Sequence, residues 1–258
     1  MKPGAAPRAT RPTVPVVLDG QEVLAHEGET ILALARRCEV PIPTLCHLDG
    51  LSVHGGCRVC IVEVDGHVRP LLACATPVHP DMEVRTATER LVEHRRTIVS
   101  LLFAEGSHVC AACVASGACE LQALATSTGV DHVPHTMAFP RHEVDASHPR
   151  FVLDRDRCVL CTRCVRVCHE VEGADVWDLA HRGNGARLIA GMDQPWGEVS
   201  ACTSCGKCVA VCPTGALFEH GTSSGERRPD PGVAAWLVEA RAGSWDDRPP
   251  VQGEEAGP

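Results

Sequence analysis

A run of four cysteines that occurs twice constrains this chain more than any other feature. The first run reads Cys158-x2-Cys161-x2-Cys164-x3-Cys168, and the second reads Cys202-x2-Cys205-x2-Cys208-x3-Cys212, followed by Pro213. In such runs, three thiolates of one tight loop hold three irons of a cubane, and the fourth cysteine serves the other cluster. The spacing therefore predicts two [4Fe-4S] clusters. The ligands of one are Cys158, Cys161, Cys164 and Cys212, and those of the other are Cys202, Cys205, Cys208 and Cys168.

The alternative for these runs is a pair of zinc sites, which also use Cys-x2-Cys pairs. The repeated 2-2-3 spacing that ends in Cys-Pro is poorly matched to one tetrahedral ion. Disulfides belong to oxidising compartments. No apolar stretch follows the basic residues of the first twelve positions, so a secretory signal is not expected. We therefore expect a cytoplasmic protein in which dense cysteine serves metal or redox chemistry.

Composition limits the fold and the partners. The length of 258 residues allows two or three small domains, and an aromatic content of 3% with no Tyr leaves little for a large aromatic core. The 16 cysteines are the other means of holding distant segments together, because ligand binding is coupled to folding. A formal net charge of −9 argues against a nucleic-acid partner. No apolar run approaches the length of a transmembrane segment.

Residues 1–13 are expected to form a disordered lead. The pattern of residues 14–86 predicts a small domain of hairpins. Asp19-Gly20 and Asp65-Gly66 are hairpin turns, and residues 30–38 have the apolar spacing of a short helix. The order of hairpin, helix, cysteine loop and hairpin is that of a β-grasp ferredoxin. The candidate ligands of one [2Fe-2S] cluster are Cys46, Cys57, Cys60 and Cys74. A single zinc ion is the alternative for this set.

Residues 87–149 predict a helical module and an extended connector. The helix is expected over residues 86–105, with Thr86-x-x-Glu89 as a capping box. The candidate ligands of a third [4Fe-4S] cluster follow it: His108, Cys110, Cys113 and Cys119. Three cysteines are one ligand short of a cubane, and neutral imidazole binds iron. A histidine taken alone is more often a solvated polar residue, and this is what we expect for His132, His135, His142 and His148.

The ligand total supports these assignments. Four such clusters need sixteen ligands, which fifteen cysteines and His108 supply. The remaining cysteine, Cys38, lies on the apolar face of a predicted helix, where a free thiol behaves as a small hydrophobic group. The chain has no G-x-G-x-x-G, P-loop or nucleophile-elbow motif. We expect no catalytic residue and no bound cofactor besides one [2Fe-2S] and three [4Fe-4S] clusters.

The expected fold class is α+β, with three cluster-binding parts in order. These are a β-grasp [2Fe-2S] ferredoxin domain over residues 14–86, the helical His/Cys3 module over 87–149, and a two-cluster bacterial-ferredoxin-like domain over 150–220. In the cysteine loops of the two-cluster domain, Arg163 and Lys207 are candidates for partly neutralising the negative charge of the clusters. The ordinary alternative is that both side chains are solvated at the surface. The tail over residues 221–258 predicts one helix over 231–242, in which Trp236, together with Trp245, is a candidate for docking on a partner. A disordered tail is the alternative for this stretch.

The spacing of Cys46 to Cys74 resembles the [2Fe-2S] domain of the large iron-sulfur subunit of respiratory NADH dehydrogenase and of related hydrogenases. The respiratory subunit has His-x3-Cys, whereas this chain has His108-x-Cys110. The shorter spacing is similar to that of the small iron-sulfur subunit of soluble NAD-reducing [NiFe] hydrogenases, as is the stretch over residues 101–110. The resemblance covers roughly residues 14–220.

The resemblance implies an electron-transfer subunit that is not catalytic on its own. Its partners would be a flavoprotein that binds FMN and NAD, and [NiFe] hydrogenase subunits. Two alternatives remain open. In the first, the chain transfers electrons to a different terminal enzyme, a formate dehydrogenase or an NADH dehydrogenase. In the second, the chain is a zinc-stabilised interaction module.

Overall fold

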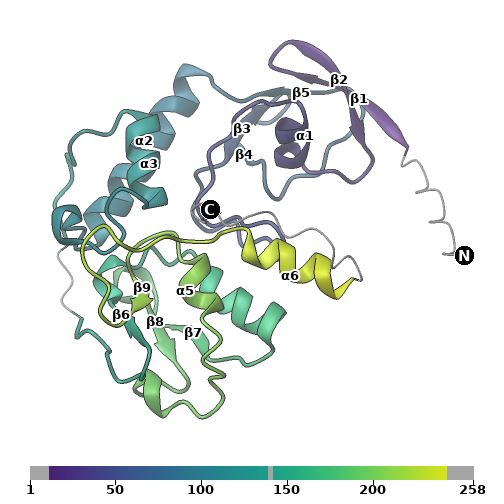
Figure 1. Ribbon diagram of the computed structural model, residues 1–258. Coiled ribbons are helices and arrows are strands. Elements are labelled where there is room, and N and C mark those ends of the chain that lie inside the picture. Colours follow the sequence, from purple (N-terminus) through teal and green to yellow (C-terminus); the bar gives the residue numbers. More distant parts are fainter. Residues whose placement is uncertain (1–11, 139–141, 243–258) are drawn as a thin grey trace, which may run out of the picture. The chain divides into compact units, whose positions relative to one another are not determined.

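A computed structural model describes residues 12–138 and 142–242, which form two compact units (Figure 1). The first unit contains residues 12–43 and 60–94, and the second contains residues 44–59 and 95–242. Most of the lead expected over residues 1–13 lies outside the described residues, and so does Trp245. Within the described ranges, no helix has the length and apolar character needed to cross a membrane.

The first unit is built on a sheet of five strands in the order β2-β1-β5-β3-β4. The strands are β1 (Thr13–Leu18), β2 (Gln21–His26), β3 (Ile61–Val64), β4 (Leu71–Leu72) and β5 (Met82–Arg85). β1 and β2 form the antiparallel hairpin predicted from Asp19-Gly20, with Val14 opposite Ala25. β5 runs parallel to β1 and antiparallel to β3, so it joins the two hairpins into one sheet.

Helix α1 (Ile31–Arg37) supplies the apolar face that covers this sheet (Figure 1). Thr30 caps it, because its hydroxyl accepts from the N–H of Ala33 at 3.2 Å. Ile31, Leu34 and Ala35 are fully buried in the same cluster as strand residues such as Val16 and Val62. Cys38 is half-buried against this cluster, so its thiol packs as an apolar group.

Helix α2 (Glu89–Glu105) begins later than the sequence predicts. The expected capping box at Thr86 is wrong, because Thr86 donates through its N–H and its hydroxyl to the carboxylate of Asp19, at 2.7 and 2.6 Å. Thr88 takes the capping role, and its hydroxyl accepts from the N–H of Leu91 at 3.3 Å. Helix α3 (Glu120–Thr128) follows, and its Leu121 and Leu124 share an apolar cluster with Val99 of α2.

The rest of the second unit has two similar halves, each with a strand, a cysteine loop, a helix and a strand. The first half contains β6 (Phe151–Leu153), α4 (Arg163–Arg166), its π-helical continuation Val167–Glu172, and β7 (Trp177–Ala180). The second contains β8 (Arg187–Ala190), α5 (Lys207–Val211) and β9 (Leu217–Glu219). β6 pairs with β9 and β7 pairs with β8, both antiparallel.

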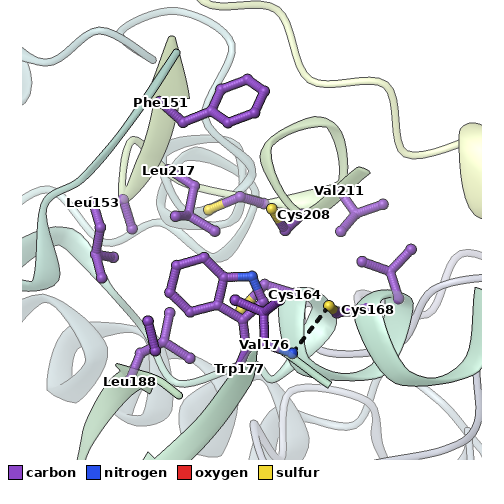
Figure 2. Packing of buried hydrophobic residues seen from close by; sticks show 14 of the residues in the cluster. Phe151, Leu153, Cys164, Cys168, Val176, Trp177, Leu188, Cys208, Val211 and Leu217 are labelled. Atoms are coloured by element: carbon purple, nitrogen blue, oxygen red, sulfur yellow. Dashed lines mark hydrogen bonds between the residues drawn. The ribbon is translucent and has the colours of Figure 1, made fainter. Parts of the chain in front are cut away.

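The core of these halves mixes apolar side chains with cysteine sulfurs. Figure 2 shows Phe151, Trp177 and Leu217 among the sulfurs of Cys164, Cys168 and Cys208. Helix α6 (Val233–Arg241) packs on the same core through the buried Ala234. Trp236 of α6 is half-buried, so the expectation of an exposed docking side chain is wrong for this residue.

Candidate iron-sulfur sites

The two cysteine loops of the second unit have the same backbone conformation at matching positions. Leu160 and Thr162 have φ angles of 50° and 59°, and Ser204 and Gly206 have φ angles of 57° and 75°. These are left-handed conformations that L-residues seldom adopt. Such a winding turns successive N–H groups toward one centre, as in anion-binding nests. Accordingly, Leu160 N–H lies 3.4 Å from Cys158 Sγ.

The inner site is the set Cys158, Cys161, Cys164 and Cys212. Burial is the main cause that raises the pKa of Cys158 and of Cys161 to about 12, and the nearby Cys212 adds to both shifts. The pKa of Cys164 is raised for the same reasons. The four thiols influence one another because they lie close together. Iron binds thiolates, so occupation of this site must release protons.

The outer site is the set Cys168, Cys202, Cys205 and Cys208, and all four line one cavity. Phe151, Trp177 and Trp196 line the same cavity. The indole N–H of Trp196 donates to Cys202 Sγ at 3.3 Å. Val176 N–H donates to Cys168 Sγ at 3.4 Å, as the dashed line in Figure 2 shows. Cys205 is the exposed member of the set. The structure therefore brings the second predicted cubane set together in an aromatic pocket.

A second cavity is lined by all four members of the third predicted set: His108, Cys110, Cys113 and Cys119. His108 Nε2 is buried and has no hydrogen-bond partner among the described residues. Burial lowers the pKa of His108, which keeps the imidazole neutral as an iron ligand requires. A side chain at Gly215 would collide with Cys113 Sγ, and one at Gly106 would collide with His108 Nε2. These features fit a cluster held by one imidazole and three thiolates.

The fourth predicted set is divided between the two units. Cys46 and Cys57 belong to the second unit, where Cys46 N–H donates to Cys57 Sγ at 3.4 Å. A hydrogen bond from the Cys57 thiol lowers the pKa of Cys46 to about 5. Cys60 and Cys74 belong to the first unit, where their sulfurs lie 3.3 Å apart. The structure thus shows two close cysteine pairs, whose inner members Cys57 and Cys60 are three positions apart in sequence.

Three buried arginines surround the inner site. Arg163 donates to both carboxylate oxygens of Glu120, at 2.5 and 2.7 Å. Burial opposes this charge, but the bond to Glu120 raises the pKa of Arg163 above its usual value. Arg227 donates to the carbonyl of Cys212 at 2.7 Å, and Arg166 donates to the carbonyl of Cys161 at 3.3 Å. Lys207, in the outer loop, forms an ion pair with Glu172.

Three family models match consecutive parts of the chain. Residues 11–89 match a 2Fe-2S iron-sulfur cluster binding domain. Residues 95–134 match the NADH-ubiquinone oxidoreductase-G iron-sulfur binding region. Residues 149–218 match the ferredoxin-like domain of NADH-quinone oxidoreductase subunit 3. A [2Fe-2S] domain, a [4Fe-4S]-binding region and a ferredoxin-like domain therefore follow one another.

Among curated proteins, the gamma subunit of the NAD-reducing hydrogenase HoxS of Cupriavidus necator is 33% identical over 208 residues, which cover 80% of this chain and 87% of that subunit. The chain belongs to this family of iron-sulfur subunits. In the crystal structure of an NAD+-reducing [NiFe]-hydrogenase in the H2-reduced state, one chain matches with a TM-score of 0.77 and 35% identity. The match covers 81% of this chain and 88% of that chain.

The same family includes much longer proteins. The NADP-reducing hydrogenase subunit HndD of Solidesulfovibrio fructosivorans is 38% identical over 213 residues, and the chain spans 36% of its length. The mitochondrial 78 kDa subunit of the NADH-ubiquinone oxidoreductase of Candida albicans is 31% identical, and the chain spans 28% of its length. The cluster-binding region is thus shared by family members that differ in what else they contain.

Several residues around the candidate sites of this family member were not expected from the sequence. Trp196 and Arg227 lie outside the ligand motifs, Glu120 directly follows Cys119, and Arg166 lies between Cys164 and Cys168. The expectation that His148 is solvated is wrong. Its side chain is buried, stacks on Phe151 and packs in a tilted arrangement against Trp196, with ring centroids 4.9 and 4.6 Å away. The positions of Arg166 and Glu120 beside predicted ligands in the chain were the signals that could have indicated them.

Proposed function

We propose that this chain is an electron-transfer subunit that carries single electrons between a flavoprotein that reacts with NAD(H) and a [NiFe] hydrogenase module. The observation that carries the proposal is the pair of cavities, each lined by four ligands of one predicted set. Iron-sulfur clusters supply one-electron redox chemistry when bound. The family membership and the hydrogenase relatives support the choice of partners.

We infer one [2Fe-2S] and three [4Fe-4S] clusters with the ligand sets given by the sequence. The inner set, the outer set and the set with His108 would each hold a cubane. The two cysteine pairs of Cys46, Cys57, Cys60 and Cys74 would hold the [2Fe-2S] cluster in a β-grasp domain, which the cysteine spacing and the family model over residues 11–89 support. The proposed domains are residues 14–86, 87–149 and 150–220, with the tail over 221–258.

The residues of the chain fix the ligands rather than perform a reaction. Buried thiols lie in loops whose neighbouring residues adopt left-handed conformations, and backbone N–H groups donate to sulfur. Hydrogen bonds to sulfur, net charge and burial are the protein's means of setting cluster potentials. A neutral imidazole in place of one thiolate makes the His108 site less negative, which favours the reduced state on charge alone.

Two alternatives differ in the partner or in the metal. In the first alternative, the terminal enzyme would be a formate dehydrogenase or an NADH dehydrogenase. The similarity to a respiratory NADH-ubiquinone oxidoreductase subunit supports this alternative. The second is a zinc-stabilised interaction module. It predicts a colourless protein without a redox signal. A cytoplasmic location is proposed from the many cysteines expected to remain thiols or thiolates.

The test is anaerobic purification of the full chain, followed by iron and acid-labile sulfide analysis and electron paramagnetic resonance (EPR). We expect iron for all four clusters and reducible signals. The variant His108→Ala should lose one cubane signal, whereas His132→Ala, at an exposed ion-paired histidine, should lose none. Survival of all four clusters in His108→Ala would place the ligand elsewhere. Co-purification of a flavoprotein and a nickel protein would identify the partners. Co-purification of a different terminal enzyme would overturn the proposed hydrogenase partner.

A further inference from the structure

Arg166 of α4 has an unusual set of hydrogen bonds. Its Nη2 donates to the carbonyl oxygen of Cys46 at 2.6 Å and to that of Cys161 at 3.3 Å. Its Nη1 donates to the carbonyl of Ser52 at 2.5 Å, and its Nε donates to Thr162 Oγ1 at 3.2 Å. All of these residues belong to the second unit. One guanidinium thus holds the backbones of two cysteines that are proposed to bind different clusters.

The positive charge of Arg166 is buried without a carboxylate beside it. The residue is 8% exposed, and no carboxylate of the described residues lies within ion-pair distance of it. Glu170, one helical turn away, attracts this charge from beyond ion-pair distance, and its carboxylate accepts from the N–H and the hydroxyl of Ser52. The neighbouring Arg163, in contrast, is paired with Glu120. A buried charge without a counter-charge is strongly unfavourable, so an anion is expected near Arg166.

We propose that Arg166 is a positioning residue shared by two clusters, the [2Fe-2S] cluster of Cys46 and the inner [4Fe-4S] cluster of Cys161, and that its charge raises the reduction potentials of both. The inference rests on the proposed ligand sets. Thiolate-ligated clusters are anionic and would supply the missing counter-charge. Each cluster gains one electron, and hence one negative charge, on reduction. A fixed cation stabilises the more negative form, while Arg166 itself gains or loses no electron, proton or bond.

Arg227 provides a matched control. It is also buried, and its Nη2 donates to the carbonyls of Cys212 and Val209, both at 2.7 Å. It therefore contacts the backbone of one proposed ligand of the inner cluster and of no proposed [2Fe-2S] ligand. Removal of its charge should affect the inner cluster alone, whereas removal of the Arg166 charge should affect two clusters.

The experiment is a redox titration of the full chain, loaded anaerobically and followed by EPR. The [2Fe-2S] signal is recorded at a temperature at which cubane signals are broadened. In Arg166→Gln, the ratio of reduced to oxidised cluster at a fixed potential should fall at least tenfold for both clusters, which is 59 mV for a one-electron couple. Arg227→Gln should produce such a fall for a cubane and leave the [2Fe-2S] ratio within threefold of wild type. Arg166→Lys keeps the charge and should return both ratios toward wild type.

Each outcome decides between the possibilities. If the loaded wild-type chain contains no clusters, the proposed function fails and the inference fails with it. If the clusters are present and Arg166→Gln changes only the thermal midpoint, or only one potential, the inference alone is overturned. Equal shifts in Arg166→Gln and Arg166→Lys would also overturn it. Should Arg166→Gln fail to load, loading of Arg166→Lys supports a requirement for the charge, and failure of both variants contradicts it.

Discussion

The inner and the outer candidate sites are formed by matching loops but have different surroundings. Around the inner site lie three buried guanidinium groups, of which Arg163 alone has a carboxylate partner within ion-pair distance in the described part of the chain. Around the outer site lie Phe151, Trp177 and Trp196, and one of its ligands, Cys205, is exposed. Identical ligand spacing therefore says little about how each cluster would behave. Charge and hydrogen bonds to sulfur in the surroundings set that behaviour.

The difference has a consequence for stability. Buried cations need anions, so the inner site depends on its occupant for more than ligand bonds. The outer site is surrounded by apolar rings, which are well accommodated in a core without any counter-charge. We expect loss of the inner cluster to weaken the folded state more than loss of the outer one.

The largest expected effect separates the two sites directly. Cys161→Ser should remove the inner cluster and leave buried guanidinium groups without their counter-charge, which destabilises the chain by about 3–5 kcal/mol beyond the loss of ligand bonds. Cys205→Ser changes an exposed ligand of the outer site and should leave the fold largely intact. Iron content and the thermal midpoint measure both effects under anaerobic conditions. Equal destabilisation by the two variants would remove the distinction.

The second prediction concerns the carboxylate at each site. Glu120→Gln leaves Arg163 buried at 2% exposure without its carboxylate partner, and should cost about 3 kcal/mol, at the low end for buried pairs because Glu120 is partly exposed. Glu172→Gln breaks the pair with Lys207, both of whose members reach solvent, and should cost about 1 kcal/mol. Thermal midpoints compare the two variants. A larger drop of the thermal midpoint in Glu172→Gln than in Glu120→Gln would contradict the conclusion that the buried ion pair lies beside the inner site.

The third prediction changes the outer site alone. Trp196→Phe keeps an aromatic ring but removes the N–H that donates to Cys202 Sγ at 3.3 Å. A hydrogen bond contributes about 1 kcal/mol, so the potential of the outer cluster should fall by about 40 mV. An EPR-monitored titration measures this, with the [2Fe-2S] potential as the internal control. No change would show that the indole acts only through packing.

The smallest expected effect is a dependence on pH. His148 Nδ1 accepts from the N–H groups of Arg150 and Phe151, and burial followed by the charge of Arg150 lowers the pKa of His148. As the pH falls below about 6.5, the unfolded chain takes up a proton that the folded chain does not, so the unfolding free energy decreases. The slope from this group is at most about 1.4 kcal/mol per pH unit.

His148→Gln should therefore flatten the acid side of a plot of thermal midpoint against pH. His132→Gln is the control, because His132 is exposed beside Asp131. An unchanged slope in His148→Gln would mean that the stacked imidazole protonates as readily in the folded chain as in the unfolded one.

Much of this arrangement was predictable from spacing. Hairpin turns and the apolar spacing of helices are local patterns, so the hairpin of β1 and β2, helix α1 and helix α6 lie within a few residues of their predicted positions. Two cavities are lined by the predicted ligand sets for the same reason. The Thr86 cap was wrong because Asp19, 67 positions earlier, competes for the hydroxyl.

The surroundings of the sites were not predictable, because they depend on contacts between distant segments. Arg166 reaches a carbonyl 120 positions away, at Cys46, and nothing in the local sequence marks that contact. His148 lies in a stretch rich in proline and histidine that reads as a solvated connector, yet rings from Phe151 and Trp196 enclose it. A single sequence shows which residues can bind metal, but not which neighbours surround them.

The pairing of β6 with β9 also has a consequence for synthesis of the protein. β6 has no other strand partner in the described chain, and β9 ends at Glu219. During synthesis, β6 cannot pair until more than sixty further residues have been added, because its partner strand β9 lies that far along the chain. Contacts this distant in sequence close slowly. A nascent chain therefore exposes cysteine loops before it can enclose them, and delivery of iron and sulfide is best matched to the moment when the last strand has emerged.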